Sequence, residues 1–131
     1  MCFFNNSYSD PIELRQGAPQ GSNLAPLIWQ KYGNDMVNSS NLLILSLFAD
    51  DTNTYKSHTQ ILTLIREINK ELSRVYQWIL DNPLAKNVKK LNCLLFNYAG
   101  GIENLPNVII GNSIIPFVNS AKFSGIIIDR K

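Results

Sequence analysis

The sequence predicts an α+β fold, an antiparallel sheet with helices packed on one face. Short apolar runs separated by turn-forming residues alternate with two helical patterns. Every connection between predicted strands, apart from the helical ones, is of hairpin length, which favours antiparallel pairing. The 131 residues fit a single domain, 1–131, and 45% hydrophobic with 17% charged residues is the composition of a packed globule.

The first residues are predicted to form a weak hairpin followed by a loop. The apolar run 1–4 is followed by turn-forming residues 5–7, and an extended pattern resumes at 12–14. Glycine and proline then punctuate residues 16–23, which predicts a loop.

A helix over 24–36 is predicted next. Ser22 or Asn23 would be its N-cap, and Pro26 is tolerated in its first turn. The near-continuous apolar run 42–48 then predicts a strand that is buried on both faces.

Two aspartates, Asp50 and Asp51, follow this strand directly, and residues 52–55 are predicted to be extended again. The pair is therefore expected at or beside the tip of a hairpin.

Residues 59–80 are predicted to form the second helix, because apolar side chains recur there at steps of three and four. This stripe, which we expect to pack on the sheet, consists of Ile61, Ile65, Ile68, Leu72, Val75 and Ile79. The helix is expected to end at residues 81–83, which include a proline.

The C-terminal third is predicted to contain several short strands. Residues 92–98 form one apolar run, and the runs 108–110 and 113–115 flank Gly111 and Asn112, a strong hairpin signal. A last short strand is expected at 126–128.

Charge and cysteine content limit the class of protein without identifying a partner. The net charge is +2, but residues 1–85 carry −2 and residues 86–131 carry +4, so the C-terminal third suits either phosphate contacts or an ordinary solvated surface. The only cysteines are Cys2 and Cys93 and the only histidine is His58, which argues against a zinc site and a disulfide framework. We expect no secretory leader, no membrane span and an intracellular location, in the nucleus or cytoplasm.

The adjacent carboxylates of Asp50 and Asp51 are the strongest candidates for chemistry. They repel each other unless cations or hydrogen bonds compensate, and their oxygens suit Mg²⁺ or Mn²⁺. Neighbouring strand residues point to opposite faces, so both can serve one metal cluster only if the backbone turns sharply. We expect Asp50 to be the main ligand and Asp51 to be more peripheral. The alternative is an ordinary Asp-Asp turn.

Four short segments carry a family resemblance. Residues 15–27 read RQGAPQGSNLAPL, residues 47–52 LFADDT, residues 84–90 LAKNVKK and residues 118–129 VNSAKFSGIIID. In this order they resemble the "GVPQGSxLGP", "FADDT", "LxLNxxKT" and "VxxxKFLGVxID" motifs of reverse transcriptases encoded by non-LTR (LINE-type) retrotransposons of the jockey kind.

The resemblance implies part of the palm of an RNA-directed DNA polymerase that transfers nucleotides by a two-metal mechanism. Asp50 and Asp51 would be catalytic metal ligands for Mg²⁺ or Mn²⁺, and Lys90 would be the catalytic cation near the triphosphate. The implied partners are an RNA template, a DNA primer and a deoxynucleoside triphosphate.

The resemblance also assigns the residues that would contact these partners. The loop residues expected beside the nucleotide and template are Pro19, Gln20, Gly21 and Ser22. The residues expected to hold the primer are Lys122, Phe123 and Gly125.

Departures from the family pattern lower the expected activity. Ala25, Leu91 and Ser124 stand where the family carries Gly, Thr and Leu. The upstream fingers and the first catalytic strand, with the family's first metal-binding aspartate, have no counterpart, and Asp10 is no substitute. We therefore expect a partial palm that is inactive alone.

Two other interpretations stay open. The chain could be a non-catalytic nucleic-acid-binding remnant of a mobile element, using its basic C-terminal third. It could also lack a biochemical role and fold poorly.

Overall fold

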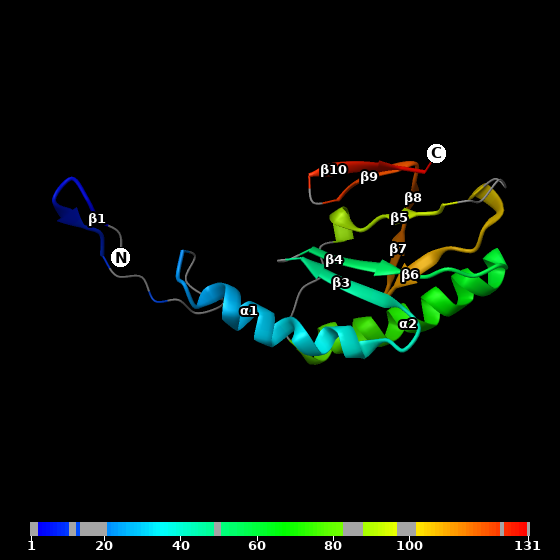
Figure 1. Cartoon of the computed structure of the whole chain (residues 1–131), viewed down its shortest axis with the longest axis horizontal. Helices are drawn as coiled ribbons and strands as arrows, with labels where there is room; N and C mark the ends of the chain where they lie inside the picture. The colour runs from blue at the N-terminus through cyan, green and yellow to red at the C-terminus, as the bar shows by residue number, and fades with distance from the viewer. Residues whose placement is uncertain are drawn as a thin grey trace. The chain divides into compact units, whose positions relative to one another are not determined.

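The structure is a computed structural model that describes residues 3–10, 13, 21–48, 51–82, 88–96, 102–123 and 125–130. The chain divides into two units, Met1–Asn34 and Asp35–Lys131 (Figure 1). No helix among the described residues is long and apolar enough to cross a membrane.

The first unit begins with a hairpin of β1 (Phe3–Phe4) and β2 (Ser7–Tyr8). Asn5 and Asn6 adopt positive φ angles of 51° and 60°, and two successive left-handed residues close a two-residue hairpin loop. The expectation that residues 1–4 pair with 12–14 was therefore wrong, because the chain reverses at the asparagines and pairs with residues 7–8. Of residues 12–14, only Glu13 is described, and it lies outside any strand.

Helix α1 (Ala25–Gly33) follows, with Pro26 in its first turn as predicted. Its N-cap is Leu24, and neither Ser22 nor Asn23 takes that position. Ser22 instead accepts a hydrogen bond from the Leu24 amide through Oγ, at 3.1 Å. The α-helix ends three residues earlier than expected, at Gly33, because glycine is a poor helix former.

The second unit starts with the 3₁₀ helix η1 (Asn34–Ser39), which begins at the boundary between the units and occupies the end of the predicted first helix. Strands β3 (Ile44–Phe48) and β4 (Asp51–Tyr55) then pair antiparallel, with Ile44 opposite Tyr55 and Phe48 opposite Asp51.

The prediction that run 42–48 is buried on both faces was wrong. Ile44 is 70% exposed and Phe48 63% exposed, whereas Leu45, on the other face, packs against the core. The buried residue of this run is Leu43, which is 6% exposed and lies just before the strand. The hairpin thus has one core face and one outer face, as is usual for antiparallel pairs.

Helix α2 (Ile61–Asp81) confirms the predicted stripe. Ile65, Leu72 and Val75 are buried, and Ile61, Ile68 and Ile79 pack against the core cluster. The helix ends at Asp81 and its C-cap is Asn82, whose backbone amide and side-chain amide both donate to the Trp78 carbonyl.

The predicted hairpin around Gly111 is confirmed as β6 (Val108–Ile110) and β7 (Ser113–Ile115), with Gly111 at φ 57°. Asn69 of α2 attaches β6 through two hydrogen bonds. Its side-chain amide donates to the Asn107 carbonyl at 2.8 Å and accepts from the Ile109 amide at 2.9 Å.

The other short elements complete the second unit. They are η2 (Val88–Lys90), β5 (Cys93–Leu94), η3 (Ile102–Asn104), β8 (Phe117–Val118), β9 (Ser120–Phe123) and β10 (Ile126–Asp129). Of the predicted strand 92–98, only Cys93 and Leu94 are in a strand among the described residues, and Asn97 and Tyr98 lie outside them.

The strands of the described residues form five two-stranded pairs instead of one sheet. Four pairs are antiparallel, as expected from the hairpin connections, but β5 pairs parallel with β8. This parallel pair joins residues that are far apart in the sequence, so no hairpin connects them. The fold is α+β as predicted, with small sheets.

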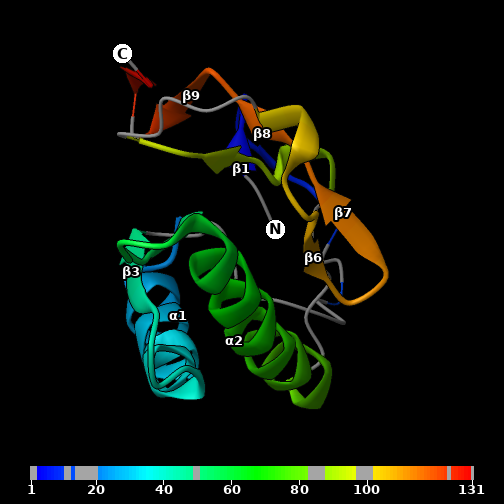
Figure 2. The ribbon, with the colours of Figure 1, turned by 90° about the vertical axis from the view of Figure 1, so that its right-hand side faces the viewer.

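The core lies where α2 meets both hairpins. Both ribbon views show α2 beside β3 and beside β6 and β7 (Figure 1 and Figure 2). The buried residues of this cluster are Leu43, Ile65, Leu72, Val108, Ile110 and Ile115.

Candidate functional site

The tip of the β3–β4 hairpin carries the acidic pair that the sequence singled out. Asp51 is the first residue of β4 and pairs with Phe48, the last residue of β3, so it lies beside the hairpin tip as predicted. It is exposed to solvent. Asp50 lies outside the described residues.

The strand alternation places Asp51 on the same face as Asn53 and Tyr55, because successive strand residues point to opposite faces. The neighbouring Thr52 points the other way, and its Oγ1 lies 3.9 Å from the Met36 sulfur. Asp51 is thus on the face of the hairpin opposite Leu45, the strand residue that packs against the core.

An exposed carboxylate with oxygen ligands suits a hard divalent cation such as Mg²⁺ or Mn²⁺. The part of the chain that the structure describes contains no group of three or more His, Cys, Asp or Glu residues that could hold a metal ion. Asp51 therefore fits as one ligand of a metal centre, and the described residues do not complete that centre.

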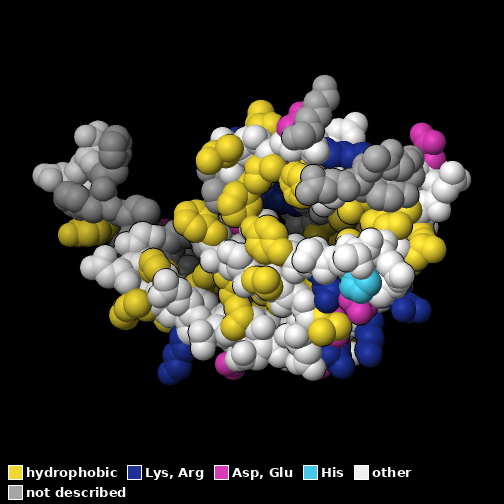
Figure 3. Space-filling model, turned by 45° about the vertical axis from the view of Figure 1, so that its right-hand side comes forward, with side chains coloured by type: hydrophobic (Ala, Val, Ile, Leu, Met, Phe, Trp, Pro, Cys, Tyr) yellow, Lys and Arg dark blue, Asp and Glu magenta, His cyan; other side chains and the backbone are white. Residues whose placement is uncertain are grey.

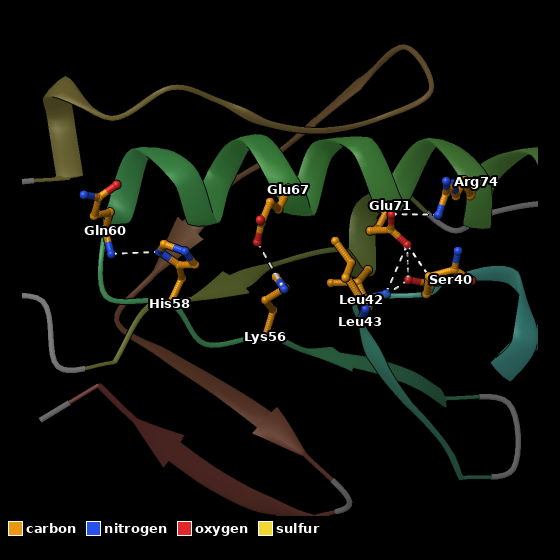
Figure 4. Close-up of polar contacts among 10 residues, drawn as sticks. Ser40, Leu42, Leu43, Lys56, His58, Gln60, Glu67, Glu71 and Arg74 are labelled. Carbon is orange, nitrogen blue, oxygen red and sulfur yellow. Dashed lines mark hydrogen bonds and ion pairs between the residues drawn. The ribbon is translucent and has the colours of Figure 1, made fainter.

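A second acidic residue, Glu71 on α2, is buried at the base of the same hairpin. Its side chain is 1% exposed. One oxygen, Oε2, accepts hydrogen bonds from Ser40 Oγ at 2.7 Å, from the Asn41 amide at 2.7 Å and from the Leu42 amide at 3.3 Å (Figure 4). The other oxygen, Oε1, pairs with Arg74 Nη1 at 2.9 Å.

These contacts determine the ionisation of Glu71. Burial desolvates the carboxylate and by itself raises the pKa of Glu71. The hydrogen bonds from Ser40 and from the Asn41 and Leu42 amides, together with the charge of Arg74, outweigh this effect and hold the pKa below its ordinary value. Glu71 is therefore a carboxylate at neutral pH.

The other strand of the hairpin is attached to α2 by an ion pair. Lys56, the residue after β4, places Nζ 3.1 Å from Oε2 of Glu67, and the two side chains are 13% and 29% exposed. The Glu67 oxygen has no aligned hydrogen-bond donor among the described residues, so the charge of Lys56 is its compensation.

Sequence reasoning did not find Glu67 and Glu71. The stripe of α2 was identified only from its apolar members, and the charged residues beside it were not considered. The available signal was the spacing, because acidic residues four apart lie on one side of a helix. Their partners, Ser40 and Lys56, could not be identified without the hairpin register.

His58, the only histidine, is exposed but does not cap α2, because the N-cap of that helix is Gln60 and no side-chain hydrogen bond caps it. His58 lies on the surface, as the cyan side chain in Figure 3 shows, and its Nδ1 accepts the Gln60 amide at 2.9 Å just before α2 (Figure 4). Cys93 is half-buried, and burial raises the pKa of its thiol.

The residues predicted to contact primer lie together on one hairpin. Lys122 and Phe123 are in β9, opposite Ile127 and Ile126 of β10, and Gly125 between the strands has a positive φ of 86°. Lys122 is exposed and Phe123 is half-buried. The roles of these residues stay predictions.

The other predicted residues lie on separate elements. Lys90, the predicted catalytic cation, is the exposed last residue of η2. Gly21, at φ 83°, and Ser22 belong to the first unit. Pro19 and Gln20 lie outside the described residues.

Comparisons with known proteins agree with the resemblance seen in the sequence. Residues 1–128 match a family model described as reverse transcriptase (RNA-dependent DNA polymerase). No solved structure matches the chain significantly.

Three curated relatives are similar over most of the chain. Two are RNA-directed DNA polymerases from mobile element jockey, of Drosophila funebris (24% identical, 89% of this chain) and of Drosophila melanogaster (28%, 96%). The third is the probable RNA-directed DNA polymerase from transposon X-element of Drosophila melanogaster (29%, 98%). The chain spans 13–14% of the length of these relatives.

Proposed function

The chain belongs to the reverse transcriptase (RNA-dependent DNA polymerase) family, and from this premise we propose that it is part of the palm of a jockey-type, RNA-directed DNA polymerase. Asp50 and Asp51 would hold the metal at which a primer 3′-hydroxyl is joined to a deoxynucleotide copied from RNA. The observation that supports this most is the position of Asp51, exposed at the tip of a hairpin where the sequence matches the family's "FADDT".

The chemistry that Mg²⁺ or Mn²⁺ supplies at such a site, when bound, is activation of an attacking hydroxyl and stabilisation of the leaving phosphate oxygens. The chain's own contribution is to hold carboxylates where that ion binds. Lys90 would offset the negative charge of the triphosphate, since a lysine acts on phosphates as a point charge. Lys122 and Phe123 would hold the primer end through a phosphate contact and through packing.

We propose further that the chain alone is not an active polymerase. Asp51 is one exposed ligand, and a two-metal centre needs more carboxylates than this hairpin offers. The chain spans only about a seventh of its relatives' length, in keeping with a site completed by sequence outside it.

The test measures metal binding before activity. We expect the chain to bind Mn²⁺ weakly, in the millimolar range typical of sites with few protein ligands, as followed by the electron paramagnetic resonance signal of free Mn²⁺. Asp50→Asn and Asp51→Asn should abolish this binding, and Asp10→Asn, an exposed acid of the first unit, should leave it unchanged. Equal binding by all four proteins would refute the metal site.

Primer extension on an RNA template with Mg²⁺ or Mn²⁺ then tests catalysis. The expected result is no incorporation by the chain alone. Incorporation that is lost in Asp51→Asn would show that the chain is active by itself and would support the site. Incorporation that survives Asp51→Asn would contradict the site.

A second candidate function is non-catalytic binding of nucleic acid. It is favoured by the charge of +4 over residues 86–131 and by the exposure of Lys89, Lys90 and Lys122. It predicts affinity for an RNA–DNA hybrid that falls steeply between about 50 and 200 mM salt, with a smaller salt slope in Lys122→Ala. Binding that does not depend on salt would exclude this function.

A further inference from the structure

We infer that Glu67 and Glu71, two acidic residues one turn apart on α2, are positioning residues that fix the direction of the β3–β4 hairpin and thereby the place of Asp51. The catalytic meaning of this inference rests on the proposed function. Neither residue is predicted to touch metal, primer or nucleotide.

The two glutamates hold the two chain segments at the base of the hairpin. Glu71 binds residues 40–42, which lead into β3, and Glu67 binds Lys56, which directly follows β4. The register pairs Ile44 with Tyr55 at this end of the hairpin. Figure 4 shows both glutamates pointing from α2 toward these segments.

Both carboxylate oxygens of Glu71 have polar partners. Three donors converge on Oε2, and Arg74 compensates Oε1. A carboxylate that accepts several hydrogen bonds at once has a defined orientation, whereas apolar contacts alone allow sliding. The Glu71 carboxylate therefore restrains the direction of residues 40–42 as well as their distance from α2.

An apolar contact lies directly beside the hydrogen bonds of Glu71. Ser40 Oγ donates to Glu71 and accepts the Leu43 amide at 3.0 Å. Leu43 is 6% exposed and belongs to the same core cluster as Leu72, the residue after Glu71. The hydrogen bonds to Glu71 thus set the direction in which β3 extends from the buried Leu43.

The length of the hairpin amplifies a small tilt at its base into a larger displacement of its tip. The five residues of β3 extend roughly 17 Å from this base to the tip at a rise of about 3.4 Å per residue. A tilt of about 5° at the base would move the tip by about 1.5 Å, and a misplacement of about 1 Å is enough to cost roughly a hundredfold in rate at a catalytic centre. A restraint at the base of the hairpin therefore affects the position of Asp51 beside its tip.

The test compares Glu71→Gln and Glu67→Gln with Glu103→Gln, the same change at an exposed glutamate of η3. Amide hydrogen exchange is measured in the β3–β4 hairpin and in the β6–β7 hairpin, which packs on the same helix. In Glu71→Gln we expect exchange to be about tenfold faster at the Asn41 and Leu42 amides and in β3–β4, and to change less than about twofold in β6–β7. Glu103→Gln should change neither hairpin.

Equal acceleration in both hairpins would overturn the inference, because it would show that Glu71 only contributes to overall stability. No acceleration in either hairpin would overturn it as well. If Glu71→Gln does not fold, Ser40→Ala serves as the second variant. It removes one donor to Oε2 and should accelerate exchange in β3–β4 selectively, by a smaller factor.

Mn²⁺ affinity separates this inference from the proposed function. We expect Glu71→Gln to weaken Mn²⁺ binding about three- to tenfold, although it removes no predicted ligand, and Glu103→Gln to leave it unchanged. Absence of Mn²⁺ binding in the unmodified chain would refute the proposed metal site, while hydrogen exchange would still decide whether the glutamates position the hairpin. Mn²⁺ binding that is unaffected by Glu71→Gln would refute the link between the glutamates and the site.

Discussion

The apolar stripe of α2 provides the sharpest test of the fold, because the helix carries two leucines in opposite environments. Leu72 is 5% exposed and belongs to the core cluster, whereas Leu62 is 61% exposed. Leu72→Ala and Leu62→Ala remove the same three carbon atoms from the same helix. The difference between the two free energies of unfolding therefore measures burial alone.

The magnitude follows from these exposures. Three carbons at about 0.8 kcal/mol each give a loss of about 2.3 kcal/mol at Leu72 and about 0.9 kcal/mol at Leu62. A residual cavity of about 50 Å³ at Leu72 adds about 1.2 kcal/mol. We therefore expect Leu72→Ala to cost about 3.5 kcal/mol, and Leu62→Ala to cost less than about 1 kcal/mol because alanine also favours the helix.

The assay is urea unfolding followed by the helical circular dichroism signal, with both variants compared to the unmodified chain at one temperature. The m-value should be the same in all three proteins, which shows that only the stability has changed. A difference below about 1 kcal/mol between the two variants would refute the assignment of this stripe to the core.

Three further predictions concern polar groups. Asn69→Ala removes both hydrogen bonds to β6 and should cost about 1–3 kcal/mol, with faster hydrogen exchange at the Ile109 amide; unchanged exchange there would contradict the attachment. Because the pKa of Glu71 is lowered in the folded chain, its contribution to stability is present at neutral pH and is lost as the pH falls below the ordinary glutamate value of about 4.3. Glu71→Gln should flatten the dependence of unfolding free energy on pH in that acidic range, and an unaltered dependence would show that another group causes it. Because burial raises the pKa of Cys93, alkylation of its thiol at pH 8 should be at least about tenfold slower in the folded chain than in urea, as followed by mass spectrometry of its peptide; equal rates would contradict its burial.

The parts of the fold that sequence predicts well are those with strong local signals. The stripe from Ile61 to Ile79 repeats over about five turns, and tertiary packing agrees with it. Gly111 supplies the positive φ that a two-residue turn needs, so the β6–β7 hairpin also follows from local sequence. In both cases the residues that determine the element are neighbours along the chain.

The parts that sequence did not predict depend on contacts between distant residues. The run 42–48 is apolar throughout, but whether both faces of a strand are covered depends on elements elsewhere in the fold, and here Ile44 and Phe48 are exposed. The pairing of Cys93 with Phe117 likewise joins segments more than 20 residues apart. Composition gives no register for such a pair.

The candidate site shows the same division. Asp51 at the hairpin tip could be predicted, because the acidic pair interrupts an apolar strand and a return strand follows. Glu71 could not, because its donors come from residues 40–42, about 30 positions earlier. The burial of a carboxylate can be predicted only when its hydrogen-bond donors are known.

The central position of α2 between two hairpins has a consequence for how the chain is made. The β3–β4 hairpin precedes α2, so it can dock as soon as residue 81 has left the ribosome, with Glu71 already able to bind Ser40. The β6–β7 hairpin starts only at Val108, and at about 5–20 residues per second its synthesis follows roughly 1–5 s later. During that interval Ile65 and Leu72 lack the partners Val108, Ile110 and Ile115, so the nascent chain exposes an apolar helix face that is open to chaperones.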